Sequence, residues 1–245
     1  MLICVNYHYI RTSFDAKYPS IFGIKPEAFE RQLHSLSKIG KFISAEDLAV
    51  TINTDAQLDG INFLITFDDG LKEQINLAVP ILERMGIPAI FFANSASFTE
   101  KRVESVHKIH LLRSILSPKE ILGMTENHLP EMSAEEISEI RKKGIEHYKY
   151  DNEDTAELKY LLNFILEKSQ LFKFIDSAFD MAFDEEAVNK ELYMSVEDIT
   201  KLAALGQLGS HGHTHIPIGL HDQHTKHKEI IGSGELFRTL TGKKP

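Results

Sequence analysis

INFLITFDDG (residues 61–70) is the stretch that decides the fold class. Its first seven residues form an almost unbroken apolar run of β-forming residues, which predicts a strand buried on both faces, as parallel strands are in α/β proteins. A helical pattern follows over about 72–85, where Pro80 predicts a kink or a boundary between two shorter helices. PAIFFA (88–93) predicts the next buried strand. Because strand, helix and strand in this order form a βαβ unit, we expect an α/β protein.

The α/β pattern continues on both sides of this unit but is interrupted in the middle of the chain. LICVNYHY (2–9) predicts a buried strand, with Cys4 as a small apolar core residue. Between about residues 98 and 190 the sequence is mostly amphipathic helix with many charges, and it contains no strand-like run. A helix capped by Ser195 and the short strand QLGS (207–210) then restore the pattern. We therefore expect a single domain over 1–245 with a helical insertion at about 98–190.

The composition argues against several classes of protein. Asp and Glu number 36 against 27 Lys and Arg, which leaves a net charge of -9, and an acidic surface repels the phosphate backbone of nucleic acids. No apolar run is long enough to cross a bilayer, and the opening MLICVNYHYIR lacks the features of a signal peptide. Since Cys4 is the only cysteine, neither an internal disulfide nor a thiolate metal cluster can form. We therefore expect a cytoplasmic protein with no nucleic-acid partner and no membrane insertion.

Two adjacent carboxylates, Asp68 and Asp69, follow the buried strand at its C-terminal tip. Like charges side by side raise each other's pKa unless a cation neutralises them, and ligand sites in α/β proteins lie beyond the carboxyl ends of strands. Gly70 allows the turn that lets both side chains face one site. The alternative explanation is an Asx turn combined with a helix N-cap, because Asp is favoured in both roles.

SHGHTHIP (210–217) places three histidines within five positions directly after the strand QLGS. A helical turn at His211 would place His211 and His215 on the same side, which is a metal-binding spacing, whereas an extended chain would pair His211 with His213. One carboxylate and two imidazoles form a usual ligand set for Zn²⁺ or a related divalent ion. Asp68 would then be left for acid–base chemistry beside the metal.

Strand-TFDDG-helix, followed later by capped helix-Gly-strand-SHxxTH, resembles the polysaccharide deacetylase (NodB homology) family of metal-dependent carbohydrate de-N-acetylases. The opening YHY (7–9) and the closing EIIGSGELFRTLTGKKP also look like the flanks of that family. The resemblance covers roughly residues 1–100 and 190–245 and leaves out the helical insertion. It implies a distorted (β/α) barrel.

The resemblance also implies roles for individual residues. By position, Asp68 matches the catalytic base of the family, and Asp69, His211 and His215 match its metal ligands. The metal implied is Zn²⁺, with Co²⁺ and Ni²⁺ as alternatives. Thr214 stands where the family often has a hydroxyl residue that steadies the histidine loop. The activity implied is hydrolysis of the carbon–nitrogen (not peptide) bond that joins an N-acetyl or related acyl group to a sugar or polysaccharide, so the expected partner is an N-acylated saccharide substrate.

The chain departs from the family near Pro245. An arginine that positions the catalytic aspartate and a late histidine that acts as general acid have no match, so the general acid is unassigned and we expect the last strands of the barrel to be absent. Three alternatives stay open: hydrolysis of a non-sugar amide by the same site, a metal oxygenase with a two-His-one-carboxylate centre, and a truncated non-catalytic relative that binds metal or saccharide. Asp68 beside the ligands favours hydrolysis over oxygenation.

Overall fold

The computed structural model describes residues 1–17, 21–54, 57–125, 132–166 and 168–245. It divides into two compact units. The first comprises Met1–Phe14, Phe22–Glu104 and Glu186–Pro245, and the second comprises Asp15–Ile21 and Ser105–Glu185. Compact units need not fold independently, so the single domain with a helical insertion stays a prediction.

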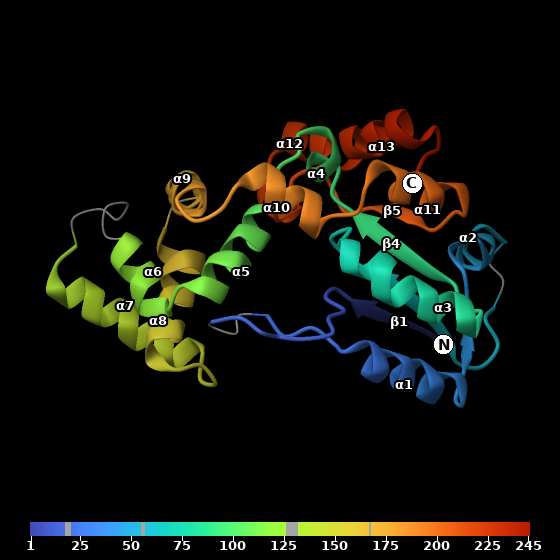
Figure 1. Cartoon of the computed structure of the whole chain (residues 1–245), viewed down its shortest axis with the longest axis horizontal. Helices are drawn as coiled ribbons and strands as arrows, with labels where there is room; N and C mark the ends of the chain where they lie inside the picture. The colour runs from blue at the N-terminus through green and yellow to red at the C-terminus, as the bar shows by residue number, and fades with distance from the viewer. Residues whose placement is uncertain (18–20, 55–56, 126–131, 167) are drawn as a thin grey trace. The chain divides into compact units, whose positions relative to one another are not determined.

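The first unit contains a parallel sheet. Its strands are β1 (Leu2–Tyr7), β2 (Lys41–Phe42), β3 (Asn62–Phe67), β4 (Ala89–Ala93) and β5 (Leu208–Ser210). The order is β1-β3-β4-β5, and β2 pairs with the first residues of β3. Because every pairing is parallel, the carboxyl ends of the strands lie at the same edge of the sheet (Figure 1). The α/β fold class is confirmed, and closure of the sheet into a barrel stays a prediction.

β3 lies at the centre of this sheet, and all six of its residues are buried. Alternate side chains point to opposite faces. Ile65 and Phe67 pack on one face with core residues of α1 (Pro26–Ser37), α3 (Val79–Met85), α11 (Val196–Ala204) and α13 (Ser233–Thr241). Leu64 lies on the other face, in a smaller cluster that includes Leu48 of α2 (Ala45–Thr54). The apolar run in INFLITF is therefore explained by apolar neighbours on both faces of β3.

β1 is more exposed than the sequence predicts. It pairs with β3 along its whole length, and its other side has no partner strand among the described residues. Leu2, Ile3 and Cys4 are exposed, and only Tyr7 at the C-terminal end is buried. The prediction of Cys4 as a core residue is therefore wrong, because β1 is an edge strand.

Local signals in the sequence account for several helix ends. The predicted helix over 72–85 consists of a π-helical turn, η1 (Gln74–Ala78), followed directly by α3. Pro80 lies in the first turn of α3, where the two kinds of helix meet. Ser195 and Asp198 form the predicted reciprocal cap of α11. The remaining short elements of this unit are α4 (Ala96–Thr99), α10 (Glu185–Leu192), η4 (Ile218–Leu220), α12 (Gln223–His227) and η5 (Lys228–Gly232).

The second unit contains helices and no strand within its described residues, as predicted. It contains α5 (Ser105–Ile115), α6 (Pro118–Thr125), α7 (Ala134–His147), α8 (Glu153–Tyr160), η3 (Leu161–Ile165) and α9 (Lys168–Asp180). Lys108 is only 1% exposed, and its Nζ lies 2.7 Å from Oδ1 of Asp176 and 2.9 Å from Oε1 of Glu185. A buried charge is tolerated when it is paired in this way, so these contacts are structural.

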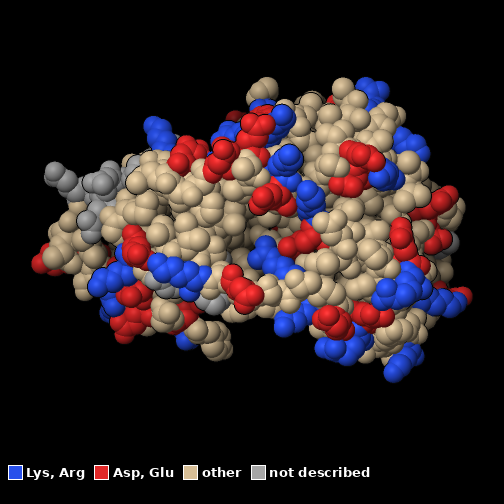
Figure 2. Space-filling view, in the orientation of Figure 1, with Lys and Arg blue, Asp and Glu red and all other residues tan. Residues whose placement is uncertain are grey.

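The helices and the surface charges can be compared with the expectations about a membrane and nucleic acid. None of the helices within the described ranges is long and apolar enough to cross a membrane. Acidic and basic side chains are interspersed over the face shown in Figure 2. That face therefore lacks the continuous basic surface that binds a phosphate backbone.

Candidate active site

The two aspartates follow β3 at a sharp turn of the backbone. Asp69 has φ 77 and Gly70 has φ 63, so two successive residues adopt the left-handed conformation, which is uncommon for a residue other than glycine. The turn is held on both sides, because the N–H of Asp68 donates to the carbonyl of Tyr7 at 3.0 Å and the N–H of Met194 donates to the carbonyl of Gly70 at 3.0 Å. A Cβ on Gly70 would lie 2.8 Å from the Cβ of Ala93. Glycine is therefore required there on steric as well as conformational grounds.

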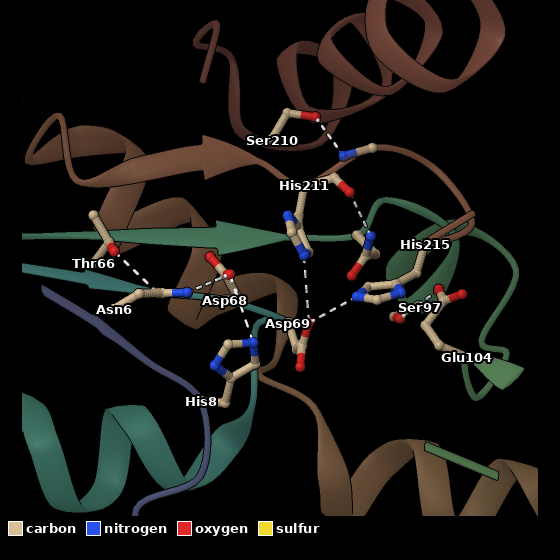
Figure 3. A network of polar contacts seen from close by, with 12 residues as sticks. Asn6, His8, Thr66, Asp68, Asp69, Ser97, Glu104, Ser210, His211 and His215 are labelled. Atoms are coloured by element: carbon tan, nitrogen blue, oxygen red, sulfur yellow. Dashed lines mark hydrogen bonds and ion pairs between the residues drawn. The ribbon is translucent and has the colours of Figure 1, made fainter. Parts of the chain in front are cut away.

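Asp69, His211 and His215 converge on one point (Figure 3). The Nε2 of His215 lies 3.2 Å from Oδ1 of Asp69, and the Nε2 of His211 lies 3.6 Å from the same oxygen. One potential ligand atom from each residue lies within 4.8 Å of the others. Tetrahedral coordination with bonds of about 2.1 Å places ligand atoms about 3.4 Å apart. The donor set and its spacing therefore fit a divalent cation such as Zn²⁺.

The surroundings of the two histidines set their protonation. A hydrogen bond to Asp69 raises the pKa of His215, and burial opposes this effect. Burial lowers the pKa of His211, and the nearby Asp68 carboxylate opposes that effect. The neutral imidazole is the form that binds a metal, so burial of His211 favours its role as a ligand.

The histidine loop is not helical. It follows β5 as an irregular segment in which Gly212 has φ 87 and His215 has φ 55. The structure has neither of the two backbones considered from the sequence, a helical turn or an extended chain, and the pair that faces Asp69 is His211 and His215. Their ring centroids lie 4.9 Å apart. Two left-handed residues bring the imidazoles together, and the spacing alone did not reveal this.

Side chains from distant segments hold the histidine loop. Buried Glu229 of η5 accepts the backbone N–H groups of His213 and Thr214, both at 2.8 Å, and the Thr214 hydroxyl at 2.6 Å. The Ser233 hydroxyl donates to the carbonyl of Gly212 at 2.8 Å, and the Asn94 amide donates to the carbonyl of His211 at 2.7 Å. Sequence reasoning missed Glu229, Ser233 and Asn94, because no local spacing links them to the histidines.

His213 points away from the candidate metal centre. Its Nδ1 lies 2.8 Å from the Ser95 hydroxyl, and its Nε2 lies 3.0 Å from Oε1 of Glu100. A Ser-His-Glu chain resembles the relay of a serine hydrolase, but Ser95 is 0% exposed, so no substrate reaches its hydroxyl. We conclude that His213 is structural and anchors the loop to the segment after β4.

Asp68 lies beside the ligand group, with its own hydrogen-bond partners. Its Oδ2 accepts a hydrogen bond from Nδ2 of Asn6 at 2.7 Å, and the Nε2 of His8 lies 3.6 Å from the same oxygen (Figure 3). The side chain of Asp68 is 17% exposed, so solvent reaches it. The sequence motifs assigned no role to Asn6 or His8, although His8 is the histidine of the YHY motif and Asn6 directly precedes that motif.

A third carboxyl group, Glu104, lies near His215 (Figure 3). Burial raises the pKa of Glu104 to about 7, and His215 opposes the shift. The Ser97 hydroxyl donates to Oε1 of Glu104 at 3.2 Å, and the backbone N–H of Glu104 donates to the Tyr193 hydroxyl at 3.0 Å. No sequence signal pointed to Glu104, which comes just before the helical segment.

A cavity of about 540 Å³ borders the two metal-binding histidines. It is lined by Ser210, His211, Gly212, His215, Ile216, Pro217, Ile218 and Ile230. A larger apolar cavity of about 640 Å³ lies between α3 and α11, but it contains none of the candidate site residues. Only the smaller of these two cavities is placed to receive a ligand next to the histidines.

Comparisons with known proteins agree with the fold and with the aspartate motif. Residues 56–169 match the model of the polysaccharide deacetylase family, a range that contains Asp68 and Asp69 and ends before His211. The match includes most of the helical segment, which the sequence motifs had left outside the resemblance. No curated protein matches the chain in sequence.

Two solved structures share the fold. The deacetylase PplD from Streptococcus pyogenes, in complex with acetate, is 10% identical with a TM-score of 0.50, and the match covers 99% of this chain and 69% of that one. A de-N-acetylase from Aggregatibacter actinomycetemcomitans is 12% identical with a TM-score of 0.51, and the match covers 100% of this chain and 76% of that one. The two structures share the fold of this chain, and the family match confirms the resemblance that TFDDG indicates, which is to the polysaccharide deacetylase family.

Proposed function

We propose that this chain is a metal-dependent hydrolase that removes N-acetyl or related N-acyl groups from saccharides. The observation that carries the proposal is the convergence of Asp69, His211 and His215, with the separate carboxylate of Asp68 next to them. Hydrolysis of an amide needs both a Lewis acid and a base, and this arrangement offers a site for each. The family match supports a saccharide substrate, as do the names of the two deacetylases that share the fold.

The residues of the chain divide the work between them. Asp69, His211 and His215 would hold the metal ion, with Zn²⁺ as the first candidate and Co²⁺ and Ni²⁺ as alternatives. When bound, such an ion polarises an amide carbonyl and lowers the pKa of a water molecule. Asp68 accepts the proton of the attacking water as general base. The hydrogen bonds of Glu229 keep the two imidazoles in place for this arrangement.

We also propose that the protein acts in the cytoplasm, on precursors of surface polysaccharides or on small saccharides. The support is the single cysteine of the sequence, Cys4, which can form no internal disulfide and so suits a reducing compartment. Fractionation of cells that express the natural gene tests this location, and recovery of the protein outside the cytoplasm would overturn it.

The direct test measures metal content and acetate release from N-acetylated oligosaccharides for the native chain, Asp69→Ala and Asp68→Asn. We expect about one divalent ion per native chain, loss of the ion in Asp69→Ala, and a metal-loaded but inactive Asp68→Asn. Metal and saccharide binding with no acetate release from the native chain would favour the non-catalytic alternative. Absence of bound metal would contradict the site itself, and activity that consumes oxygen would favour the oxygenase.

A further inference from the structure

We infer that Asn6 is a positioning residue for Asp68, and this inference rests on the proposed function. The sheet register brings the two residues together, because Asn6 is the direct partner of Thr66 in the parallel pair β1–β3. Since alternate residues of a strand share a face, Asp68 continues the face of Thr66, whereas Tyr7 and Phe67 point into the core. The pairing of β1 with β3 therefore places an amide next to the carboxylate of Asp68.

The hydrogen bonds set the orientation of this amide. An ionised carboxylate only accepts hydrogen bonds, so Asn6 must present its NH₂ group to Oδ2 of Asp68, at 2.7 Å. Its carbonyl oxygen then faces Thr66, whose hydroxyl donates to it at 3.0 Å. Thr66 is buried in β3, so the amide is anchored by a side chain that the sheet itself holds. The two hydrogen bonds, from Thr66 to Asn6 and from Asn6 to Asp68, therefore restrict the orientation of the Asp68 carboxylate.

This arrangement occupies one oxygen of Asp68 and leaves the other for the reaction. Oδ2 accepts from Asn6 and also has the imidazole of His8 at 3.6 Å. Within the described residues, Oδ1 of Asp68 receives no hydrogen bond. A general base must lie within hydrogen-bonding distance of the proton that it accepts. Oδ1 can approach a water molecule in this way, because Oδ2 already accepts a hydrogen bond from Asn6. The neutral side-chain amide of Asn6 therefore sets the orientation of the Asp68 carboxylate.

The test compares Asn6→Leu, which keeps a similar volume but removes both hydrogen bonds, with the native chain. Misplacement of a base by about 1 Å can cost about 100-fold in rate, so we expect kcat to fall by about 10- to 100-fold while KM and metal content change by less than about two-fold. Asn53→Leu is the matched control, because Asn53 is an exposed residue of α2 at a distance from the site in sequence. Its kinetics should equal those of the native chain.

A second pair of variants separates positioning from a merely structural role. Thr66→Val removes the hydroxyl that anchors the amide, and we expect a smaller loss of kcat, about 3- to 10-fold. Thr66→Ser restores the hydroxyl and should recover most of that loss. Equal losses in Thr66→Val and Thr66→Ser would overturn the inference, as would a loss of metal or of folded protein that parallels the loss of activity.

A structural readout distinguishes failure of the inference from failure of the proposed function. Crystal structures of the native chain and Asn6→Leu should show the Asp68 carboxylate rotated or disordered only in the variant. An unmoved carboxylate in Asn6→Leu would overturn the role of Asn6, whatever the activity. If the native chain releases no acetate, the proposed function fails, but the comparison of the two crystal structures still decides whether Asn6 positions Asp68.

Discussion

The aspartate half and the histidine half of the site are held in different ways. Asp68 and Asp69 continue β3, and the bonds at the turn come from backbone groups of Tyr7 and Met194. The histidine loop is irregular, and a single buried carboxylate, that of Glu229, accepts three of its hydrogen bonds. The aspartate half is thus built into the sheet, whereas the histidine half depends on a few side chains from other segments. We expect the histidine half to be the more sensitive to single substitutions.

The largest expected effect is that of Glu229→Ala. It would leave the buried N–H of His213 and the half-buried N–H of Thr214 without an acceptor, and each orphaned donor costs about 1–3 kcal/mol, so we expect a loss of about 4 kcal/mol in stability. The loop that carries both imidazoles would loosen, and metal affinity should fall by about 10- to 100-fold. Denaturant unfolding and metal titration measure the two effects.

Glu235→Ala is the matched control for that substitution. Glu235 is a half-exposed residue of α13 that pairs with Arg238, and ion pairs that solvent reaches in this way contribute little. If Glu229→Ala and Glu235→Ala had the same metal affinity, the histidine half would not depend on Glu229 as we describe.

Glu104→Gln tests the buried carboxyl group beside the histidine half. Burial raises the pKa of Glu104 from 4.5 to about 7 in the folded chain, so the unfolded state ionises first and the native chain loses stability as the pH rises from about 4.5 to about 7. The shift in pKa corresponds to a loss of about 3 kcal/mol in the free energy of unfolding over this pH range. Glu104→Gln has no carboxyl group at this position and should not show that loss. Urea unfolding of the metal-free chain at pH 4 and pH 8 measures the difference, and parallel pH profiles for the two proteins would contradict it.

Gly70→Ala tests the aspartate half. A Cβ there would meet the Cβ of Ala93 at 2.8 Å, and the residue has φ 63. Gly60 has φ 70 with nothing within 4 Å, so Gly60→Ala bears the same conformational cost without the clash. We expect Gly70→Ala to be less stable than Gly60→Ala by about 2 kcal/mol in thermal or denaturant unfolding. Equal stabilities of the two variants would mean that the turn after β3 adjusts to the added Cβ at little cost. The aspartate half would then be less rigid than we describe.

The smallest effect is expected at Cys4, which lies on β1 two residues before Asn6. Cys4 is exposed at the edge of the sheet, so Cys4→Ser should change the free energy of unfolding by less than about 0.5 kcal/mol. Acetate release should be unchanged. A large loss of stability in Cys4→Ser would show that this edge is covered in solution.

Much of the fold and the chemical identity of the site could be read from the sequence, because local patterns specify both. The run INFLITF, buried at every residue from Asn62 to Phe67, marked the central strand. The Ser195–Asp198 cap and Pro80 marked helix boundaries, since capping and proline geometry act over a few residues. The motifs TFDDG and SHGHTH named the residues that converge in the structure, Asp69, His211 and His215.

Only the tertiary structure decided how these residues are held and which neighbours they have. The position of β1 at the edge exposed Cys4, because strand order depends on pairing between segments far apart in sequence. The left-handed backbone at Asp69 and His215, and not a helical turn, brings carboxylate and imidazole together. Glu229, Glu104 and Asn6 reach the site from separate elements, and no local spacing encodes such contacts. The sequence by itself determined the chemistry that is available, and the packing of distant segments determined its geometry.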